Sequence, residues 1–202
     1  MGDIIIIGAG GHAKVVADIA CKLGHNVLGF LDDNDSTPAK ILGFDYLGCI
    51  DKCTSFGSDV EFVVGIGDNN TRQKIVNKYD LKYAFLVHPS AQIGLEVSIG
   101  DGTVVMANAV VNSDTTVGKH CILNSGCIVE HDNVIADFVH LSPNATLCGR
   151  VSVGERTWIG AGATVKNGVA VCGDCVVGTG GVVVKNIVSS GTYIGIPVRS
   201  KR

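Results

Sequence analysis

The chain has 202 residues, a length that allows one or two domains. Its 16 Lys and Arg against 19 Asp and Glu give a formal charge of −3, so no basic surface predicts nucleic-acid binding. No apolar run reaches the length of a membrane span, and nothing before the first apolar run resembles a signal peptide. We therefore expect a soluble cytoplasmic protein that binds neither nucleic acid nor membrane.

The N-terminal segment, 1–84, is predicted to form an α/β half-Rossmann domain of the βαβ type. In chain order the patterns predict strands over 4–7, 26–31 and 59–66 and helices over 13–23 and 71–79. The stretch between the first strand and the first helix, Gly8–Ala13, has the spacing G-x-G-x-x-(G/A). This combination is typical of domains that bind a nucleotide.

A candidate nucleotide pocket lies at the ends of these strands. Backbone N–H groups of Gly10, Gly11 and His12 at a helix N-terminus would face phosphates. Asp32 and Asp33 follow the second strand and would accept hydrogen bonds from a base or ribose. A full dinucleotide fold is about twice as long as this segment, so one mononucleotide-like group is favoured over NAD; a tight turn without a ligand is the alternative.

The rest of the chain, residues 85–202, is organised by a six-residue repeat. Every sixth residue from Val87 to Val183 is Val, Ile or Leu, and a column of mostly small or β-branched residues runs in parallel from Ala91 to Gly181. This is the hexapeptide repeat of a parallel β-helix, in which three short strands make one coil and coils stack about 4.8 Å apart. Seventeen aliphatic positions at three per coil predict a little under six coils.

The 8 cysteines are interpreted as structural thiols. Cys121, Cys127 and Cys175 fall in the column of small residues, where a thiol acts as a compact apolar side chain. Disulfide bonds and metal ligation are the alternatives that this placement disfavours.

One hexad departs from the repeat pattern and is the candidate for chemistry. Glu130 stands where Gly is common, and His131 and Asp132 follow it at an expected corner. A carboxylate beside an imidazole is the usual arrangement of a general base, because it fixes the tautomer and stabilises the imidazolium. His140 lies half a coil further on, and the alternative is that both histidines only cap turns.

Taken together, the motifs resemble one family. They are GAGGHAK, FLDD, GIGDNNTR, VHPSA, VEHD, FVHLS and GIP, in that order along nearly the whole chain. This series is similar to the nucleotide-amino-sugar N-acetyltransferases of bacterial glycan synthesis and the related sialic acid O-acetyltransferase-like proteins. The resemblance implies a left-handed β-helix, a homotrimer with its site between subunits, acetyl-CoA as donor, and a nucleotide-linked 4-amino-4,6-dideoxy sugar as acceptor.

The resemblance also implies roles for individual residues. His131 matches the catalytic base, and Asp132 stands where the family usually has Glu. His140, Ala161 and Thr179 match positions that contact acetyl-CoA, the last two one coil apart. The positions that match the nucleotide-sugar pocket are Gly10, Gly11, His12, Asp32, Asp33 and Gly67, and Gly149 is a candidate oxyanion donor. No metal is expected.

Several other functions stay open from the sequence. The acceptor could be a hydroxyl of sialic acid or of another sugar, and a covalent route could pass through Cys148. A trimeric β-helix carbonic anhydrase would hold zinc with His120, His131 and His140, and a sensor would bind the sugar nucleotide without turnover. The base of the nucleotide and the configuration of the sugar are not predicted.

Overall fold

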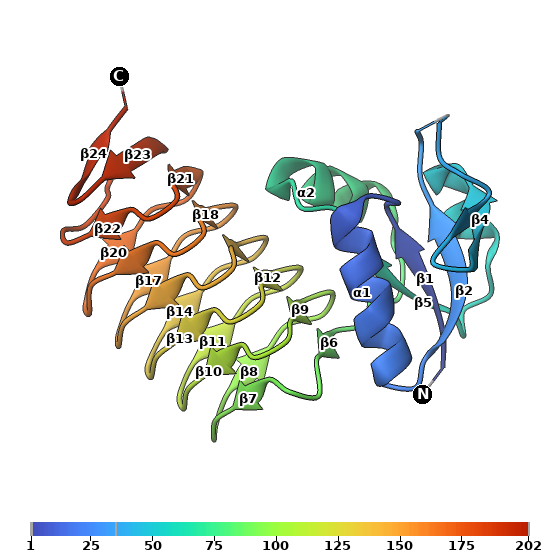
Figure 1. Ribbon diagram of the computed structural model, residues 1–202, viewed down its shortest axis with the longest axis horizontal. Coiled ribbons are helices and arrows are strands. Elements are labelled where there is room, and N and C mark those ends of the chain that lie inside the picture. The colour runs from blue at the N-terminus through green and yellow to red at the C-terminus, as the bar shows by residue number, and fades with distance from the viewer. Residues whose placement is uncertain (1, 35, 202) are drawn as a thin grey trace. The chain divides into compact units, whose positions relative to one another are not determined.

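The computed structural model describes residues 2–34 and 36–201, which fall into two compact units (Figure 1). The first unit ends at Leu86 and the second begins at Val87. The first is an α/β unit and the second is a parallel β-helix.

The α/β unit is built on one five-stranded sheet with the order β3-β4-β2-β1-β5. Its strands are β1 (Asp3–Ile7), β2 (Asn26–Leu31), β3 (Lys40–Ile41), β4 (Phe44–Gly48) and β5 (Glu61–Val64). Its helices are α1 (Gly11–Lys22), the 3-10 helix η1 (Ile50–Ser55) and α2 (Asn69–Lys78). The central pairs β1–β2, β1–β5 and β2–β4 are parallel, whereas β3 pairs antiparallel with β4.

The run of four isoleucines explains why β1 is central. Ile4 to Ile7 are all fully buried, as expected for a parallel strand with neighbours on both sides. α1 packs on β1 and β2, and its buried face consists of Ala13, Val16, Ala17, Ile19 and Ala20. Because β1 runs parallel to both β2 and β5, the loops after these three strands meet at the same edge of the sheet.

The sequence predicted the main elements of this unit but missed its edge. Both helices begin slightly earlier than expected, and α2 is capped by Asp68, whose side chain accepts a hydrogen bond of 2.8 Å from the N–H of Thr71. β3, β4 and η1 were not predicted, because the half-buried segment that forms β4 lacks a clear alternation of apolar and polar residues.

The β-helix consists of three sheets that share one interior, and their strands pair in parallel except for the last strand of sheet 1. Sheet 1 contains β6 (Leu86–Val87), β9 (Val104–Val105), β12 (Ile122–Leu123), β15 (His140–Leu141), β18 (Trp158–Ile159), β21 (Cys175–Val177), β23 (Gly191–Gly195) and β24 (Val198–Ser200). Sheet 2 contains β7 (Gln92–Ile93), β10 (Val110–Val111), β13 (Ile128–Val129), β16 (Thr146–Leu147), β19 (Thr164–Val165) and β22 (Val182–Val183). Sheet 3 contains β8 (Ser98–Ile99), β11 (Thr116–Val117), β14 (Val134–Ile135), β17 (Ser152–Val153) and β20 (Ala170–Val171).

The strand register of these sheets follows directly from the six-residue repeat. Strands three apart in sequence pair with a constant offset of three hexads, as in Val110 with Ile128. The seventeen strands from β6 to β22 match the seventeen aliphatic positions, so the predicted number of coils is confirmed. Leu123 and Leu141 are fully buried, whereas Ile93 of the first coil is 39% exposed because only one neighbouring coil stacks on it.

The corners bring the backbones of successive coils close together. Asp114, Asp132 and Arg150 occupy one column of corner residues with positive φ values of 58°, 59° and 57°. The glycines that follow the aliphatic positions provide clearance for the next coil: a Cβ on Gly100 would lie 2.7 Å from the carbonyl carbon of Gly118. The regular spacing of these glycines therefore reflects the close approach of successive coils at the corners.

The last strand of the β-helix unit reverses direction. β23 pairs parallel with β21, and β24 then returns antiparallel along β23 (Figure 1).

Across the part of the chain that the structure describes, neither α-helix has the length and apolar character needed to cross a bilayer.

Candidate active site

His131 lies in the corner between β13 and β14, in contact with the carboxylate next to it. Its Nδ1 atom is 2.6 Å from Oδ2 of Asp132, whose left-handed backbone turns the carboxylate back toward the ring. The shorter Asp therefore reaches the imidazole although the resembling family usually has Glu at this position. A carboxylate accepts a hydrogen bond from Nδ1–H, so Nε2 carries the lone pair that a base needs. The His131 side chain is 56% exposed.

Gly149 lies one coil beyond His131 and faces its ring. A Cβ on Gly149 would lie 2.7 Å from both Cε1 and Nε2 of His131, so only glycine leaves this space open. The two corners are joined by the N–H of Arg150, which donates to the carbonyl of His131 at 3.0 Å. The backbone of Gly149 thus runs beside the reactive edge of the imidazole.

The Glu130 side chain points to a different partner. Its Oε2 accepts a hydrogen bond of 3.0 Å from Nδ2 of Asn112, one coil earlier. Asp132, and not Glu130, is therefore the acid that contacts the imidazole. The sequence placed both acids next to His131, but only the backbone conformation of the corner distinguishes them.

His140 lies on β15 of sheet 1, away from the corner of His131. Its ring stacks on Trp158 with centroids 5.6 Å apart and planes inclined by 3°, and its Nε2 is 3.2 Å from Nδ2 of Asn124. Trp158 in turn donates from Nε1 to Oγ of Ser142 at 2.6 Å and is 45% exposed. The sequence missed Trp158 and Asn124, although Trp158 follows His140 by one full coil and pairs with it in sheet 1.

Ala161 and Thr179 lie in successive turns of one corner column. The N–H of Gly180 donates to the carbonyl of Ala161 at 2.9 Å, which places the two turns directly against each other. Thr179 is exposed and Ala161 is half-buried.

The predicted nucleotide pocket residues gather at the strand-end edge of the α/β sheet. Gly10 caps α1 and Gly11 begins it, and a Cβ on either would meet nothing within 4 Å. Asp32 reaches the same loop, because its Oδ2 accepts from the N–H of Ala9 at 2.6 Å. Asp33 holds η1 instead, with Oδ1 accepting from the N–H of Ile50 at 2.8 Å.

The loop after β5 is held by a buried arginine that the sequence did not single out. Nη1 of Arg72 donates to the carbonyls of Ile66 at 3.0 Å and Gly67 at 3.3 Å, and Nη2 donates to Oδ1 of Asn69 at 2.7 Å. Burial and, secondly, the charge of Arg72 lower the pKa of His12 to about 4. His12 is therefore a neutral imidazole at pH 7, able to donate and accept one hydrogen bond each.

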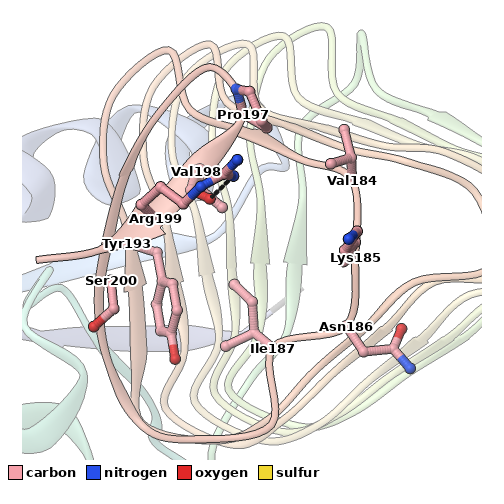
Figure 2. A pocket seen from close by; sticks show the side chains of 9 residues that line it. All are labelled: Val184, Lys185, Asn186, Ile187, Tyr193, Pro197, Val198, Arg199 and Ser200. Carbon is pink, nitrogen blue, oxygen red and sulfur yellow. Dashed lines mark hydrogen bonds between the residues drawn. The ribbon is translucent and has the colours of Figure 1, made fainter.

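A separate pocket of about 480 Å³ lies at the C-terminal end of the β-helix, where Figure 2 shows its side chains. Its lining combines apolar groups with the cations Lys185 and Arg199. It contains Pro197 of the GIP motif and none of the predicted site residues. The complete lining is Val184, Lys185, Asn186, Ile187, Tyr193, Pro197, Val198, Arg199 and Ser200.

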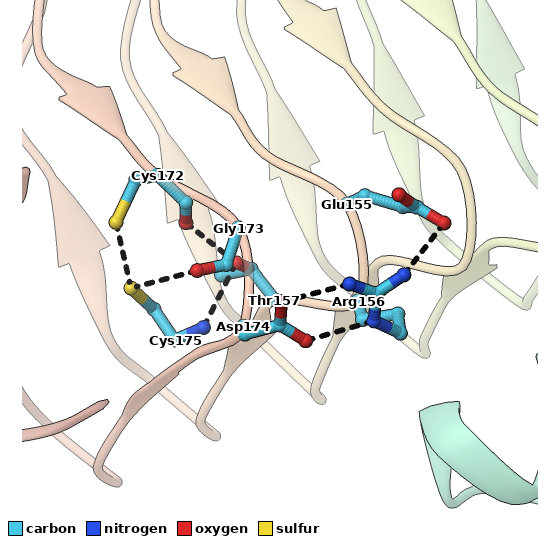
Figure 3. Close-up of polar contacts among 7 residues, drawn as sticks. All are labelled: Glu155, Arg156, Thr157, Cys172, Gly173, Asp174 and Cys175. Carbon is cyan, nitrogen blue, oxygen red and sulfur yellow. Dashed lines mark hydrogen bonds and ion pairs between the residues drawn. The ribbon is translucent and has the colours of Figure 1, made fainter. Parts of the chain in front are cut away.

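All eight cysteines are free thiols. Cys121, Cys127 and Cys175 are buried as their column predicts, and burial raises the pKa of Cys127 to about 12. Cys172 and Cys175 form a close pair that was not singled out in the sequence, and their Sγ atoms are 3.4 Å apart (Figure 3). Within residues 2–34 and 36–201, no group of three His, Cys, Asp or Glu is placed to hold a metal ion.

Two family models match the chain. The PglD N-terminal domain covers residues 3–79, and the bacterial transferase hexapeptide model (six repeats) covers residues 96–131. The acetyltransferase domain of PglB from Neisseria gonorrhoeae FA1090, solved with acetyl coenzyme A, is 34% identical, with a TM-score of 0.94 and 98% of each chain covered. The chain belongs to the nucleotide-amino-sugar N-acetyltransferase family.

Two further family members are similar over different lengths. PerB from Caulobacter crescentus, solved with CoA and GDP-perosamine, is 36% identical with a TM-score of 0.92, covering 100% of this chain and 98% of that one. The UDP-N-acetylbacillosamine N-acetyltransferase of Bacillus subtilis (strain 168) is 36% identical over 119 residues, which are 53% of this chain and 52% of the relative. The chain spans about half the length of the curated relatives that it matches.

Proposed function

We propose that this protein transfers the acetyl group of acetyl-CoA to the amine of a nucleotide-linked 4-amino-4,6-dideoxy sugar, as a cytoplasmic step of bacterial glycan synthesis. The observation that carries the proposal is the imidazole of His131, held at Nδ1 by Asp132 and facing Gly149 with its other edge. Membership of a family whose solved members hold acetyl-CoA, or CoA with GDP-perosamine, supports the two substrates.

The proposed chemistry is direct transfer. The sugar nitrogen attacks the thioester carbonyl while Nε2 of His131 takes a proton from it, so a C–N bond forms and the π electrons of the carbonyl move to its oxygen. The C–S bond breaks afterwards, when this tetrahedral intermediate collapses. The negatively charged oxygen of the tetrahedral intermediate accepts a hydrogen bond from the N–H of Gly149, and the proton passes to the departing thiolate of CoA. Asp132 stabilises the imidazolium formed midway.

The two units have different proposed tasks. The open N-terminus of α1 at Gly10 and Gly11, with neutral His12, Asp32, Asp33 and Gly67 at the same sheet edge, is assigned the sugar nucleotide, because helix N-termini favour phosphates. His140, with the stacked Trp158 beside it, is assigned the acetyl-CoA, together with Ala161 and Thr179. On this assignment the α/β unit sets acceptor affinity and the β-helix performs the reaction.

The active form is proposed to be a homotrimer. His131 is exposed on a convex corner, and the regular hexads from Val87 to Val183 extend no long loop to cover it. Base catalysis and oxyanion stabilisation are strongest in a site from which water is excluded, so neighbouring subunits are expected to supply the missing walls. Sedimentation equilibrium measures the assembly, and specific activity should fall when dilution dissociates it.

The test of function is release of CoA thiol from acetyl-CoA with a panel of UDP-, GDP- and dTDP-linked 4-amino sugars. We expect turnover with one nucleotide series, and mass spectrometry of the product should place the acetyl group on nitrogen. Turnover on sialic acid or another sugar hydroxyl, with none on the amines, would show that the enzyme acetylates oxygen and would overturn the proposed amine acceptor. Binding of sugar nucleotides without thiol release would overturn the enzyme proposal in favour of a sensor.

A further inference from the structure

Asn133 is the one asparagine in the column of small residues that runs from Ala91 to Gly181. Other positions of this column carry Ala, Val, Thr, Cys or Gly, and the side chain of Asn133 is fully buried. A buried amide is costly unless its donors and acceptor are hydrogen-bonded, so its contacts indicate why the position is polar.

The ordinary polar residue of this column links one coil to the next. Oγ1 of Thr103 donates to the carbonyl of Gly118 at 2.8 Å and accepts from the N–H of Cys121 at 2.9 Å. Both partners lie further along the chain, by 15 and 18 residues. The side chain of Thr103 therefore joins coils, and within its own corner it is the backbone N–H that donates, to the carbonyl of Gly100 at 3.3 Å.

Asn133 makes the same link and adds a contact within its own corner. Its Oδ1 accepts from the N–H of Val151 at 2.9 Å, the equivalent of the Thr103 contact with the next coil. Its Nδ2 donates back to the carbonyl of Glu130 in the same corner. The same carbonyl of Glu130 also accepts a hydrogen bond of 3.1 Å from Oγ1 of Thr115, so it has two side-chain donors.

The carbonyl of Glu130 belongs to the peptide group that leads into His131. The peptide group on the other side is fixed by the next coil, where Arg150 N–H donates to the His131 carbonyl, and by the previous coil, where Asp132 N–H donates to the Ser113 carbonyl at 3.1 Å. The hydrogen bond from Asn133 holds the peptide group before His131, and the two backbone bonds hold the peptide group after it. The backbone is therefore held on both sides of the imidazole. Through Val151 it also ties this corner to the segment that follows Gly149.

We propose that Asn133 is a positioning residue, which holds the His131 corner in register with Gly149 so that base and oxyanion donor face the same reacting carbon. This inference rests on the proposed acetyl transfer. The neutral amide takes no part in proton transfer and acts through the backbone. A displacement of about 1 Å at a catalytic group can cost on the order of 10² in rate, which sets the scale of the effect.

The test is Asn133→Thr, which keeps an acceptor for the Val151 N–H and removes the donor to Glu130. We expect kcat to fall about tenfold to a hundredfold, with KM for acetyl-CoA and for the acceptor within about twofold of wild type. The matched control is Thr103→Val, which removes a buried hydroxyl of the same column far from this corner in sequence and should leave kcat within about twofold. In a His131→Ala background, the Asn133 substitution should change residual turnover by less than about twofold.

A second readout needs no substrate. In nitrogen-15 spectra of the imidazoles, assigned by loss of a signal in His131→Ala, wild type should show one His131 tautomer with the proton on Nδ1. Asn133→Thr should shift this signal toward a mixture of tautomers, while Thr103→Val should not. Wild-type kcat together with a wild-type tautomer signal in Asn133→Thr would overturn the inference. Absence of turnover in wild type would overturn the proposed function, and the tautomer signal would still decide the role of Asn133.

Discussion

The two units hold their residues in place by different means. In the α/β unit, Ile6 of β1 has β2 on one side and β5 on the other, so each central position has its own surroundings. In the β-helix, Leu141 lies between Leu123 and Ile159, and the same surroundings recur with every coil. A residue that departs from the pattern is therefore conspicuous in the β-helix, whereas in the α/β unit functional positions must be recognised from strand order and loops.

The largest expected effect is on catalysis in the β-helix. His131→Ala should lower kcat by about 10²–10⁴, the usual contribution of a general base, with little loss of stability because the side chain is more than half exposed. Steady-state thiol release with the best acceptor measures the change. The parallel variant His12→Ala, in the α/β unit, should act mainly on KM for the acceptor. A near wild-type rate in His131→Ala would place the chemistry elsewhere.

The repeat makes the stability of the β-helix depend on position within the stack. Leu123→Ala, in a fully buried middle coil, should cost about 2–5 kcal/mol of unfolding free energy. Ile93→Ala, in the first coil and 39% exposed, should cost less than about 1 kcal/mol. Urea unfolding followed by fluorescence of Trp158, the single tryptophan of the chain, reports on this unit alone. Equal costs would contradict the stacking account.

Two glycine substitutions separate the tasks of the units. Gly149→Ala would place a methyl group 2.7 Å from Nε2 of His131, so kcat should fall about tenfold or more with acceptor KM little changed. A Cβ on Gly10 would meet no protein atom within 4 Å, and its φ of −78° suits alanine, so Gly10→Ala should cost only the weaker N-cap, about 1 kcal/mol. It should fold normally and raise KM for the sugar nucleotide several-fold. Initial-rate kinetics with each substrate varied distinguish the two, and the opposite pattern would reverse the assignment of tasks.

The smallest expected effect concerns the paired corner residues in Figure 3. Arg156 donates to both carboxylate oxygens of Asp174 at 2.8 Å and 2.7 Å and holds the pKa of Asp174 below its usual value. The depressed pKa means that the stabilisation is present above about pH 4 and is lost as pH falls through the folded-state pKa. Because the Asp174 side chain is 49% exposed, the pair should contribute only a few tenths of a kcal/mol.

Thermal unfolding measures how much the Arg156–Asp174 ion pair contributes to stability. Asp174→Asn should lower Tm by about 1 °C at pH 7, and by less at pH 3, where wild type has begun to lose the same interaction. High salt should also reduce the difference, since the pair is exposed. A pH-independent difference would mean that packing, and not charge, accounts for the change.

The sequence predicted the β-helix more fully than its site. The aliphatic and small-residue columns are local spacings, so they were visible without a structure, and so was the unusual corner at His131. The contacts of Trp158 with His140 and of Gly149 with His131 depend on stacking of successive coils. The members of both pairs are one full coil apart, so reading the chain in coils in addition to hexads would have found them.

In the α/β unit, different features could not be predicted from the sequence. The apolar runs predicted β1, β2 and α1, but β4 carries no alternation and joins the sheet through its pairing with β2. Arg72 lies on α2 three residues before the buried Ile75, and its residue type alone does not distinguish it from an exposed arginine. Its burial follows from carbonyl groups of the loop after β5, which only the folded chain brings within reach.

The reversal of β24 along β23 bears on how such a protein avoids polymerisation. A parallel stack of identical coils has no inherent limit, because every finished coil offers the next one a row of matching hydrogen-bonding groups. A strand that runs the opposite way presents a different pattern, so another β-helix cannot continue sheet 1 in register at that edge. The hairpin at 191–200 therefore makes end-to-end fibre growth unfavourable on this sheet, and helps the stack to remain a discrete molecule.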